Sequence, residues 1–255
     1  MAPIVKSTGA SEWPRCVHIG TAGWAIPKAH AGSFPEQGTG LARYAQIFNA
    51  AEINSTFYRP HRASTFERWR DSVPDEFRFA VKVPKSITHE QMLVGAGRDF
   101  AAFASSLSGL GDRLGPLLLQ LPPKLAFDPI VIEAFLSEAS DTGQSLVLEP
   151  RHASWSSAEA DDLLARFDVA RVGADPERFA GAGKPGGASK LGYLRLHGSP
   201  RIYFSSYGED VIAALSEQMR RHPGPIWCIF DNTASGAAAG DAFRLMHALA
   251  DDLKN

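Results

Sequence analysis

Polar and charged side chains alternate with leucines in a short run near residue 195. Tyr193, Arg195 and His197 take every second position, and Leu194 and Leu196 lie between them. Alternate residues of a β-strand share one face, so the run predicts a strand with one apolar face. Its other face carries groups that bind anions and transfer protons. An isolated buried charge is costly, which means that Arg195 needs carboxylate partners.

Other strand-like runs supply such partners by the same alternation. The polar residues expected to face inward with this set are Glu52, Asn54, Lys82, Gln120, Glu149 and one of Asp231 or Asn232. Their carboxylates and cations nearly cancel. We expect them to meet at the carboxyl ends of parallel strands, where barrel enzymes carry their chemistry. The alternative is a satisfied polar network that only fixes the strand register.

Loops after these strands add aromatic, imidazole and amide groups. Aromatic faces beside polar groups suit sugar-like ligands, whose C–H faces stack while their hydroxyls form hydrogen bonds. The expected ligand-binding residues are Thr21, Trp24, Asn54, Tyr58, His89, Gln120, Arg151, His152, Trp155, Asp231 and Asn232. Each aromatic residue would equally serve to close the top of a core. The small residues after 193–197 and 226–231 suit a phosphate, although a plain helix start explains them as well.

The elements that must position these residues alternate along the chain. The predicted strands cover 17–23, 51–57, 77–83, 116–121, 145–149, 170–174, 193–197 and 226–231. The predicted helices cover 41–49, 64–71, 100–110, 129–140, 156–167, 210–222 and 238–253. Ser156 and Asp128 are the expected caps of two of these helices. Eight strands alternating with helices over 255 residues favour an α/β fold of the TIM-type (β/α)8 barrel class over an open doubly wound sheet.

The connection over 175–190 is expected to lack a regular helix. It matches Gly-x-Gly-x-x-Gly, but Pro185 stands where the helix of a dinucleotide-binding motif would begin, so we reject that reading. We expect an irregular excursion and a candidate lid.

Composition restricts the class of protein. The chain is 44% hydrophobic and has 26 Lys and Arg against 28 Asp and Glu, which is unlike the basic surface of a dedicated nucleic-acid binder. No apolar run approaches the ~20 residues of a membrane span, and residues 1–14 lack a signal pattern. Cys16 and Cys228 fit free thiols in a reducing compartment. We expect one cytoplasmic domain over 1–255, with 1–14 as an N-terminal extension and a small molecule as its ligand.

Six motifs occur in order along nearly the whole chain. They are Ile19-Gly20-Thr21-Ala22-Gly23-Trp24, Glu52-Ile53-Asn54-Ser55-Thr56-Phe57-Tyr58, Ile87-Thr88-His89, Gln120-Leu121-Pro122-Pro123, Glu149-Pro150-Arg151-His152-Ala153-Ser154-Trp155 and Tyr193-Leu194-Arg195-Leu196-His197-Gly198. Together they resemble the YecE-like family (domain of unknown function 72). The resemblance implies a TIM-type barrel and supplies no activity. Asp231, Asn232 and Asp241 depart from it, because the family tends to have paired asparagines and a later asparagine there.

The leading functional hypothesis is an enzyme that acts on a sugar, polyol or sugar phosphate by acid–base chemistry. Glu149 is its expected base, Lys82 and Arg195 stabilise negative charge, and His197 transfers a proton. Glu52 and Asn54 would orient the ligand. Glu52 beside Lys82 would keep the lysine protonated, which disfavours Schiff-base chemistry.

Two alternatives stay open. A metal-dependent phosphodiester hydrolase of the endonuclease type would bind a divalent metal through some of Glu52, Glu149, His89, His152, His197 and Asp231. No tight local spacing such as His-x-x-x-His supports it, and no cofactor is predicted. A non-catalytic protein would hold a small ligand at the same rim. The commonest retaining-glycosidase arrangement is disfavoured, because Gln120 and His197 end the strands where it places carboxylates.

Overall fold

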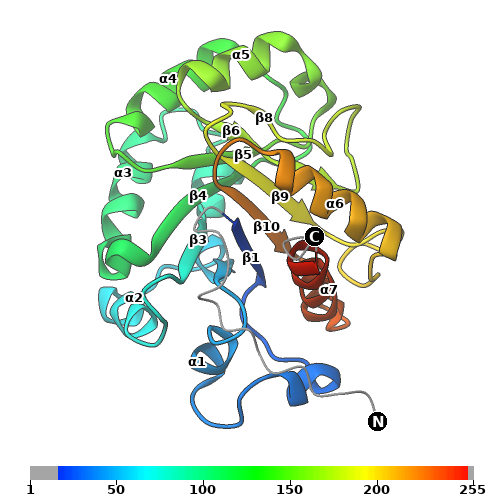
Figure 1. Ribbon diagram of the computed structural model, residues 1–255. Helices are drawn as coiled ribbons and strands as arrows, with labels where there is room; N and C mark the ends of the chain where they lie inside the picture. Colours follow the sequence, from blue (N-terminus) through cyan, green and yellow to red (C-terminus); the bar gives the residue numbers. More distant parts are fainter. Residues whose placement is uncertain (1–16, 252–255) are drawn as a thin grey trace.

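The computed structural model describes residues 17–251, which form a nearly closed barrel of mostly parallel strands with helices outside it (Figure 1). The predicted extension 1–14 and Cys16 lie outside the described residues. The strands are β1 (Val17–Ala22), β2 (Ala50–Ile53), β3 (Arg78–Lys82), β4 (Leu114–Gln120), β5 (Leu146–Glu149), β6 (Ala170–Arg171), β7 (Gly173–Asp175), β8 (Gly186–Gly187), β9 (Gly192–Leu196) and β10 (Ile226–Phe230). Their order in the sheet is β7-β9-β10-β1-β2-β3-β4-β5-β6-β8, and only the β6–β8 pair is antiparallel.

The barrel closes through its sixth strand, which is interrupted at Val172. β6 pairs with β5, and β7 pairs with β9 at the other end of the sheet. The backbone N–H of Val172 still donates to the Leu148 carbonyl oxygen at 2.9 Å. One short stretch of chain therefore joins both ends of the sheet. The predicted (β/α)8 barrel is confirmed, and the open doubly wound sheet is excluded.

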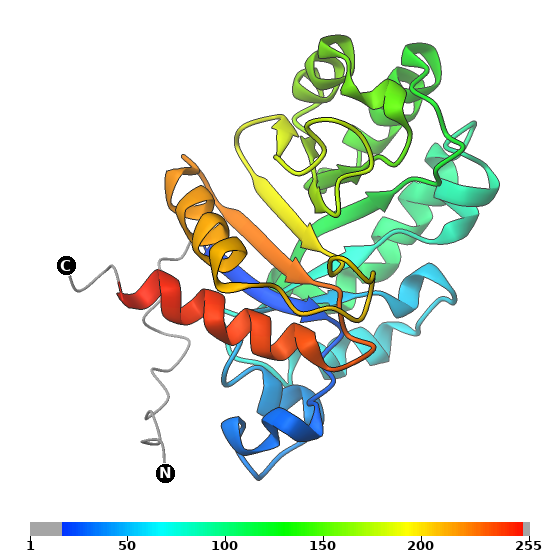
Figure 2. The same cartoon turned by 90° about the vertical axis from the view of Figure 1, so that its right-hand side faces the viewer.

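Seven α-helices of the described chain accompany the strands. They are α1 (Gly40–Tyr44), α2 (Ala63–Arg70), α3 (Gly97–Ser106), α4 (Pro129–Ser140), α5 (Ala158–Arg166), α6 (Glu209–Arg221) and α7 (Ala237–Asp251). Figures 1 and 2 show α6 and α7 side by side on the outside of β10 and β1. None of the helices in residues 17–251 is long and apolar enough to span a membrane.

Local capping fixes where two helices begin. The Asp128 carboxylate accepts from the backbone N–H groups of Ile130 and Val131 at 3.0 and 3.3 Å, which confirms the predicted start of α4. The N-cap of α5 lies one residue later than predicted, because Ser157 rather than Ser156 accepts from Ala160 N–H, at 3.2 Å.

Shorter helical turns lie in the loops. The 3-10 turns are Lys28–Ser33, Ser55–Phe57, Leu107–Arg113 and Ala153–Ser156, and a π-helical turn covers Ser86–Glu90. The predicted strand over 51–57 was too long, because its last three residues form the Ser55–Phe57 turn.

The excursion over 175–190 contains no helix, as predicted, and touches the barrel through β8. Arg171 of β6 anchors it by donating to the carbonyl oxygens of Gly181 and Lys184, both at 3.3 Å. The same guanidinium pairs with Asp161 of α5 at 2.7 Å. Movement of this segment as a lid stays a prediction.

The barrel interior is apolar in its lower part and polar at its carboxyl end. The buried apolar interior consists of Ala50, Ala80, Leu118, Val147, Ala170, Val172, Tyr193, Trp227 and Ile229. Two residues further along the same strand faces come Glu52, Lys82, Gln120, Glu149, Arg195 and Asp231. Because alternate residues of a strand share one face, these charged side chains all lie at one rim of the barrel. Close strand packing also requires a small residue at Gly20, where an added Cβ would overlap the carbonyl oxygen of Ala50.

Candidate functional site

Arg195 lies at the centre of a buried ionic network at the rim. Its Nη2 donates to Glu52 Oε1 at 2.8 Å, and its Nη1 donates to Glu149 Oε2 at 3.1 Å. Nη2 also lies 3.0 Å from Asp231 Oδ2. Arg195, Glu52 and Glu149 are at most 1% exposed, and Tyr193 donates its hydroxyl to Glu52 Oε2 at 2.8 Å. One guanidinium thus joins carboxylates from β2, from β5 and from the end of β10.

Glu149 is fully occupied by donors. Besides Arg195, its oxygens accept from Arg151 Nε and Nη2 at 3.1 and 3.0 Å and from Gln120 Nε2 at 3.0 Å, and His197 Nε2 lies at 3.1 Å. Burial acts to raise the pKa of Glu149, but His197, Arg195 and Arg151 together hold that pKa well below its ordinary value. A carboxylate that is so strongly stabilised is a poor proton acceptor. The geometry therefore does not support the expected role of Glu149 as the base.

His197 bridges two carboxylates. Its Nδ1 lies 3.0 Å from Asp231 Oδ2 and its Nε2 lies 3.1 Å from Glu149 Oε1. Burial acts to lower the pKa of His197, but Glu149 and Asp231 outweigh it and raise that pKa. Carboxylates face both ring nitrogens, and Arg195 Nη1 and Arg151 Nη2 lie 3.4 and 3.5 Å from Nε2, so the ring is held in place and is not poised as the expected proton shuttle.

The His197 bridge predicts a pH-dependent contribution to stability. The folded-state pKa lies above the unfolded value of about 6.5, so the stabilisation is fully present below that value. It is lost as the pH rises through the folded-state pKa. We expect His197→Gln to lower the free energy of unfolding more at pH 5.5 than at pH 8.5, as measured by urea denaturation. His247→Gln, at an exposed position on α7, is the control, and an equal loss in both variants would contradict the bridge.

Lys82 is the exception in this network, because no carboxylate of residues 17–251 forms an ion pair with it. Its Nζ lies 4.2 Å from the centroid of the Phe57 ring, and the residue is 8% exposed. Burial, followed by the charge of Arg195, lowers the pKa of Lys82 to about 8. Glu52 does act to raise the pKa of Lys82, as expected, but burial and Arg195 outweigh it, and Glu52 itself is held by Arg195 and Tyr193.

His89 contacts the same aromatic ring as Lys82. The His89 and Phe57 ring centroids are 5.0 Å apart, with an interplanar angle of 82°. Burial and the charges of Lys82, Arg151 and Lys124 lower the pKa of His89, so its imidazole is neutral at pH 7. Phe57 thus lies next to a cationic amine on its face and a neutral imidazole in a T-shaped contact.

The hydrogen bonds of Thr88 favour one tautomer of His89. The Thr88 hydroxyl donates to the Pro84 carbonyl oxygen at 3.3 Å and lies 2.9 Å from His89 Nδ1. In the tautomer in which the hydroxyl gives its single proton to Pro84, it accepts from Nδ1–H. This assignment leaves Nε2 with a free lone pair, which is the state that a general base requires.

Other predicted ligand residues lie around this pair. Asn54 is half-buried, and its buried Oδ1 has no hydrogen-bond partner within the described chain. Tyr58 is 73% exposed and packs edge-on against Phe57, with centroids 5.0 Å apart. Asn54 and Tyr58, together with Gln120 and Arg151, are the predicted ligand residues that the structure brings to the rim.

Three predicted residues contact other parts of the fold instead. The Thr21 hydroxyl lies 3.0 Å from the hydroxyl of Tyr44, on the helix side of β1. Trp24 packs edge-on against Trp69 of α2, with centroids 5.0 Å apart. Trp155 is fully buried and donates Nε1–H to the Leu125 carbonyl oxygen at 3.1 Å. These side chains close the core rather than line the network.

Two further predicted residues are also occupied elsewhere. His152 caps the Ala153–Ser156 turn, and its Nδ1 lies 2.8 Å from Ser154 Oγ. Asn232 donates to Asp241 Oδ2 at 2.6 Å, so Asp231 is the member of its pair that joins the network.

The sequence interpretation did not single out Phe57 or Tyr203. Phe57 follows β2 inside a 3-10 turn, where strand alternation no longer tells which way a side chain points. The Tyr203 ring lies 6.0 Å from the His197 ring at 82°, and its backbone N–H donates to the His197 carbonyl oxygen. Its φ of 69° places it in the left-handed region, which no signal in the sequence indicates.

The donor set does not fit a divalent metal. Within residues 17–251, no three His, Cys, Asp or Glu side chains are arranged to hold a metal ion. Glu149 and Asp231 are engaged by Arg195, and both nitrogens of His197 are engaged by carboxylates. A metal would have to displace these partners, and His152 lies outside the network, so we derive no metal-dependent step.

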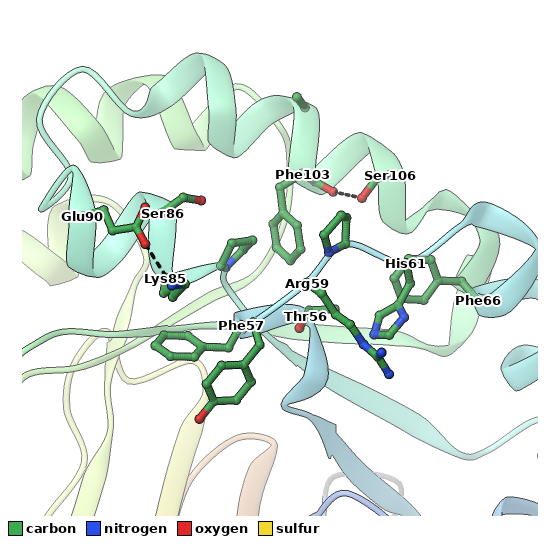
Figure 3. A pocket seen from close by; sticks show the side chains of 14 residues that line it. Thr56, Phe57, Arg59, His61, Phe66, Lys85, Ser86, Glu90, Phe103 and Ser106 are labelled. Atoms are coloured by element: carbon green, nitrogen blue, oxygen red, sulfur yellow. Dashed lines mark hydrogen bonds and ion pairs between the residues drawn. The ribbon is translucent and has the colours of Figure 1, made fainter.

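A cavity of about 390 Å³ adjoins the network through Phe57 (Figure 3). It lies between the loop after β2, the loop after β3 and helix α3. Figure 3 shows Phe103 across the cavity from Phe57 and shows Lys85 paired with Glu90, at 3.1 Å. Phe57 therefore separates the Lys82 ammonium from a largely apolar hollow.

The fold and the site define a (β/α)8 barrel protein with a buried ionic network at its carboxyl rim. The family model described as "Protein of unknown function DUF72" matches residues 18–255, and the chain belongs to that family. The UPF0759 protein YecE of Escherichia coli (strain K12) is 35% identical over 107 residues, which cover 42% of this chain and 38% of YecE. The matched region is thus well under half of that relative.

Solved structures agree with this fold. A DUF72 family protein from Enterococcus faecalis V583 has a TM-score of 0.78 at 20% identity, covering 92% of this chain and 95% of that one. A sugar phosphate isomerase/epimerase from Parabacteroides distasonis has a TM-score of 0.54 at 11% identity, covering 96% of this chain and 99% of that one. At these identities the similarity establishes the fold alone.

Proposed function

We propose that the protein is an enzyme that acts on an anionic sugar or polyol derivative, such as a sugar phosphate, by acid–base chemistry at the carboxyl rim. The observation that carries this proposal is the unpaired, nearly buried ammonium of Lys82 beside a network in which every carboxylate is engaged. A buried charge without an ion-pair partner is unfavourable for folding alone. A ligand that supplies a negative charge would pair with the Lys82 ammonium and explain why the charge is retained.

The charge balance of the rim favours an anion. The cations Lys82, Arg151 and Arg195 equal in number the carboxylates Glu52, Glu149 and Asp231, and the raised pKa of His197 favours a further positive charge on its ring. Protonation of His197 therefore gives the rim an excess of positive charge. Lys124 adds positive charge near the rim, because its charge helps to lower the pKa of His89. Neutral sugars would leave this excess unmatched, whereas a phosphate or carboxylate group would neutralise it.

The groups around Phe57 suit proton transfer next to a carbonyl. His89 offers a free Nε2 lone pair, and Lys82 places positive charge where an enediolate would develop. The Phe57 edge and the unpaired Asn54 Oδ1 suit the C–H and hydroxyl groups of a polyol. Arg195 and its carboxylates are positioning groups in this scheme.

The structural relatives support this class only indirectly. The Parabacteroides distasonis protein is named as a sugar phosphate isomerase/epimerase, and its similarity is one of fold. Isomerisation and epimerisation both require a proton to leave carbon, for which a neutral imidazole and a fixed cation are suitable. The assignment to this substrate class rests mainly on the charges at the rim of this chain.

Thermal melting with a panel of ligands tests the proposal. Sugar phosphates and sugar acids are expected to raise the melting temperature, and neutral sugars of the same carbon number are not. A ligand at about 100 times its Kd adds about 2.7 kcal/mol to the free energy of unfolding. Lys82→Met is expected to abolish the shift, whereas Lys85→Met, at the exposed Lys85–Glu90 pair, should keep it. Equal stabilisation by neutral sugars would overturn the choice of an anionic substrate.

Proton exchange in D2O separates an enzyme from a binding protein. A ligand identified by the melting assay is expected to lose the ¹H NMR signal of the proton on the carbon next to its carbonyl, and His89→Gln should slow that loss. Binding without exchange or turnover would favour the non-catalytic alternative.

A further inference from the structure

We propose that Lys82 forms a covalent iminium with an aldehyde or ketone group of the substrate. The inference rests on the proposed function and narrows it, because it makes the ligand an anionic carbonyl compound. It also assigns Lys82 a nucleophilic role in place of the purely electrostatic one that the sequence predicted.

Lys82 is the only amine among the rim cations, and its nitrogen is not engaged by an ion pair within residues 17–251. The carboxylates that would otherwise hold it are occupied: Glu52 by Arg195 and Tyr193, and Glu149 by Arg195, at 2.8 to 3.1 Å. The contact that Nζ makes is with the face of Phe57, 4.2 Å from the ring centroid. An aromatic face attracts the ammonium but does not take up the lone pair of the free amine.

The free amine is accessible at ordinary pH. Because burial and Arg195 lower the pKa of Lys82 to about 8, about a tenth of the side chain is unprotonated at pH 7 and half at pH 8. A lysine that is desolvated and placed beside another cation is the usual form of an amine nucleophile.

The iminium suits this environment as well as the ammonium does. Both carry a single positive charge, so the contact with Phe57 and the charge balance against Glu52, Glu149 and Asp231 are retained. No new unpaired charge is buried when the covalent bond forms. The iminium also withdraws electrons from the adjacent carbon, which makes its proton easier to remove.

The step balances without an oxidant or a reductant. A water molecule carries a proton from the Lys82 ammonium to His89 Nε2, and the free Nζ lone pair attacks the carbonyl carbon. The attack leaves a positive charge on nitrogen and a negative charge on oxygen, and water carries a proton from the nitrogen to the oxygen, which gives a neutral carbinolamine. Its hydroxyl then receives the proton held by His89 and leaves as water, while the nitrogen lone pair forms the C=N bond. Hydrolysis reverses the sequence and releases the amine.

Reductive trapping tests this inference. The intact protein is incubated with glyoxylate or dihydroxyacetone phosphate as probes, and sodium cyanoborohydride reduces any iminium to a stable amine. We expect one adduct per chain by intact mass, located at Lys82 by peptide mapping, with a yield that rises between pH 6.5 and pH 8.5. Lys82→Arg keeps the charge and should give no adduct there, whereas Lys85→Arg should be trapped like the wild type.

The outcomes separate the two proposals. Adducts spread over exposed lysines, with Lys82 unmodified, would overturn the covalent step. If anionic carbonyl compounds still raise the melting temperature and exchange protons in D2O, the proposed function survives that result. If Lys82→Arg retains proton exchange at the wild-type rate, Lys82 acts as a charge and the iminium is ruled out. Absence of both binding and trapping would overturn both proposals.

Discussion

The Arg195→Met variant is expected to lose about 3–5 kcal/mol of the free energy of unfolding at pH 7. Arg195 is 1% exposed and pairs with three carboxylates, from Glu52, Glu149 and Asp231. Methionine fills a similar volume but leaves those anions without their central cation. The loss would come from the stranded carboxylates rather than from a cavity, so it should be smaller at low pH, where they become protonated.

Arg151→Met is the matched control for this experiment. Arg151 makes the same kind of contact with Glu149, at 3.0 Å, but its side chain is 14% exposed and it reaches a single carboxylate of the network. We expect a clearly smaller loss in urea denaturation, with an unchanged dependence on denaturant concentration. If Arg195→Met does not fold, Arg195→Lys should give an intermediate loss, because it retains the charge but not the planar fork. Equal losses at positions 195 and 151 would contradict the central role of Arg195.

The inward-facing set of the barrel was predictable from strand alternation. Glu52, Glu149 and Arg195 each lie between apolar residues that must face the helices, and the parallel register then brings them to one rim. The choice between Asp231 and Asn232 was not predictable, because both follow the end of β10. That choice depends on contacts with His197 on one side and with Asp241 on the other.

The pairing within the set was not predictable either. Alternation shows that Glu52 and Lys82 share the interior, but not that Arg195 and Tyr193 reach Glu52 and leave Lys82 beside Phe57. Such a choice depends on side-chain length and on the stagger of strands that are far apart in the sequence.

Loop residues show a different limit of sequence interpretation. Phe57 and His89 lie in a 3-10 turn and a π-helical turn, where the period of two that guides strand assignments no longer applies. Thr21 was the opposite case, since it shares its strand face with Ile19, which packs against the helices. Alternation applied to β1 would have excluded it from the rim.

Lys82→Met is expected to raise the free energy of unfolding by up to about 3 kcal/mol at pH 7. The fall in the pKa of Lys82 from 10.5 to about 8 measures how much the folded state disfavours its charge, at about 1.4 kcal/mol per unit. The side chain is 8% exposed, so little solvent screening reduces this penalty. Methionine has no charge to desolvate and retains contact with Phe57. Lys82 thus lowers the stability of the folded protein, and such a loss of stability is the compromise with function expected at an active site.

The pH dependence of this gain identifies its cause. Between pH 8 and pH 10.5, the unfolded wild type binds a proton at Lys82 that the folded protein has released, so wild-type stability rises with pH across that window. The advantage of Lys82→Met over the wild type should therefore shrink between pH 7 and pH 10 in urea denaturation. Lys85→Met, which removes a lysine that is half exposed, should change stability by no more than about 0.5 kcal/mol at either pH. A loss of stability in Lys82→Met at pH 7 would show that the ammonium holds the rim together, and the rim would then have no spare cation to offer a substrate.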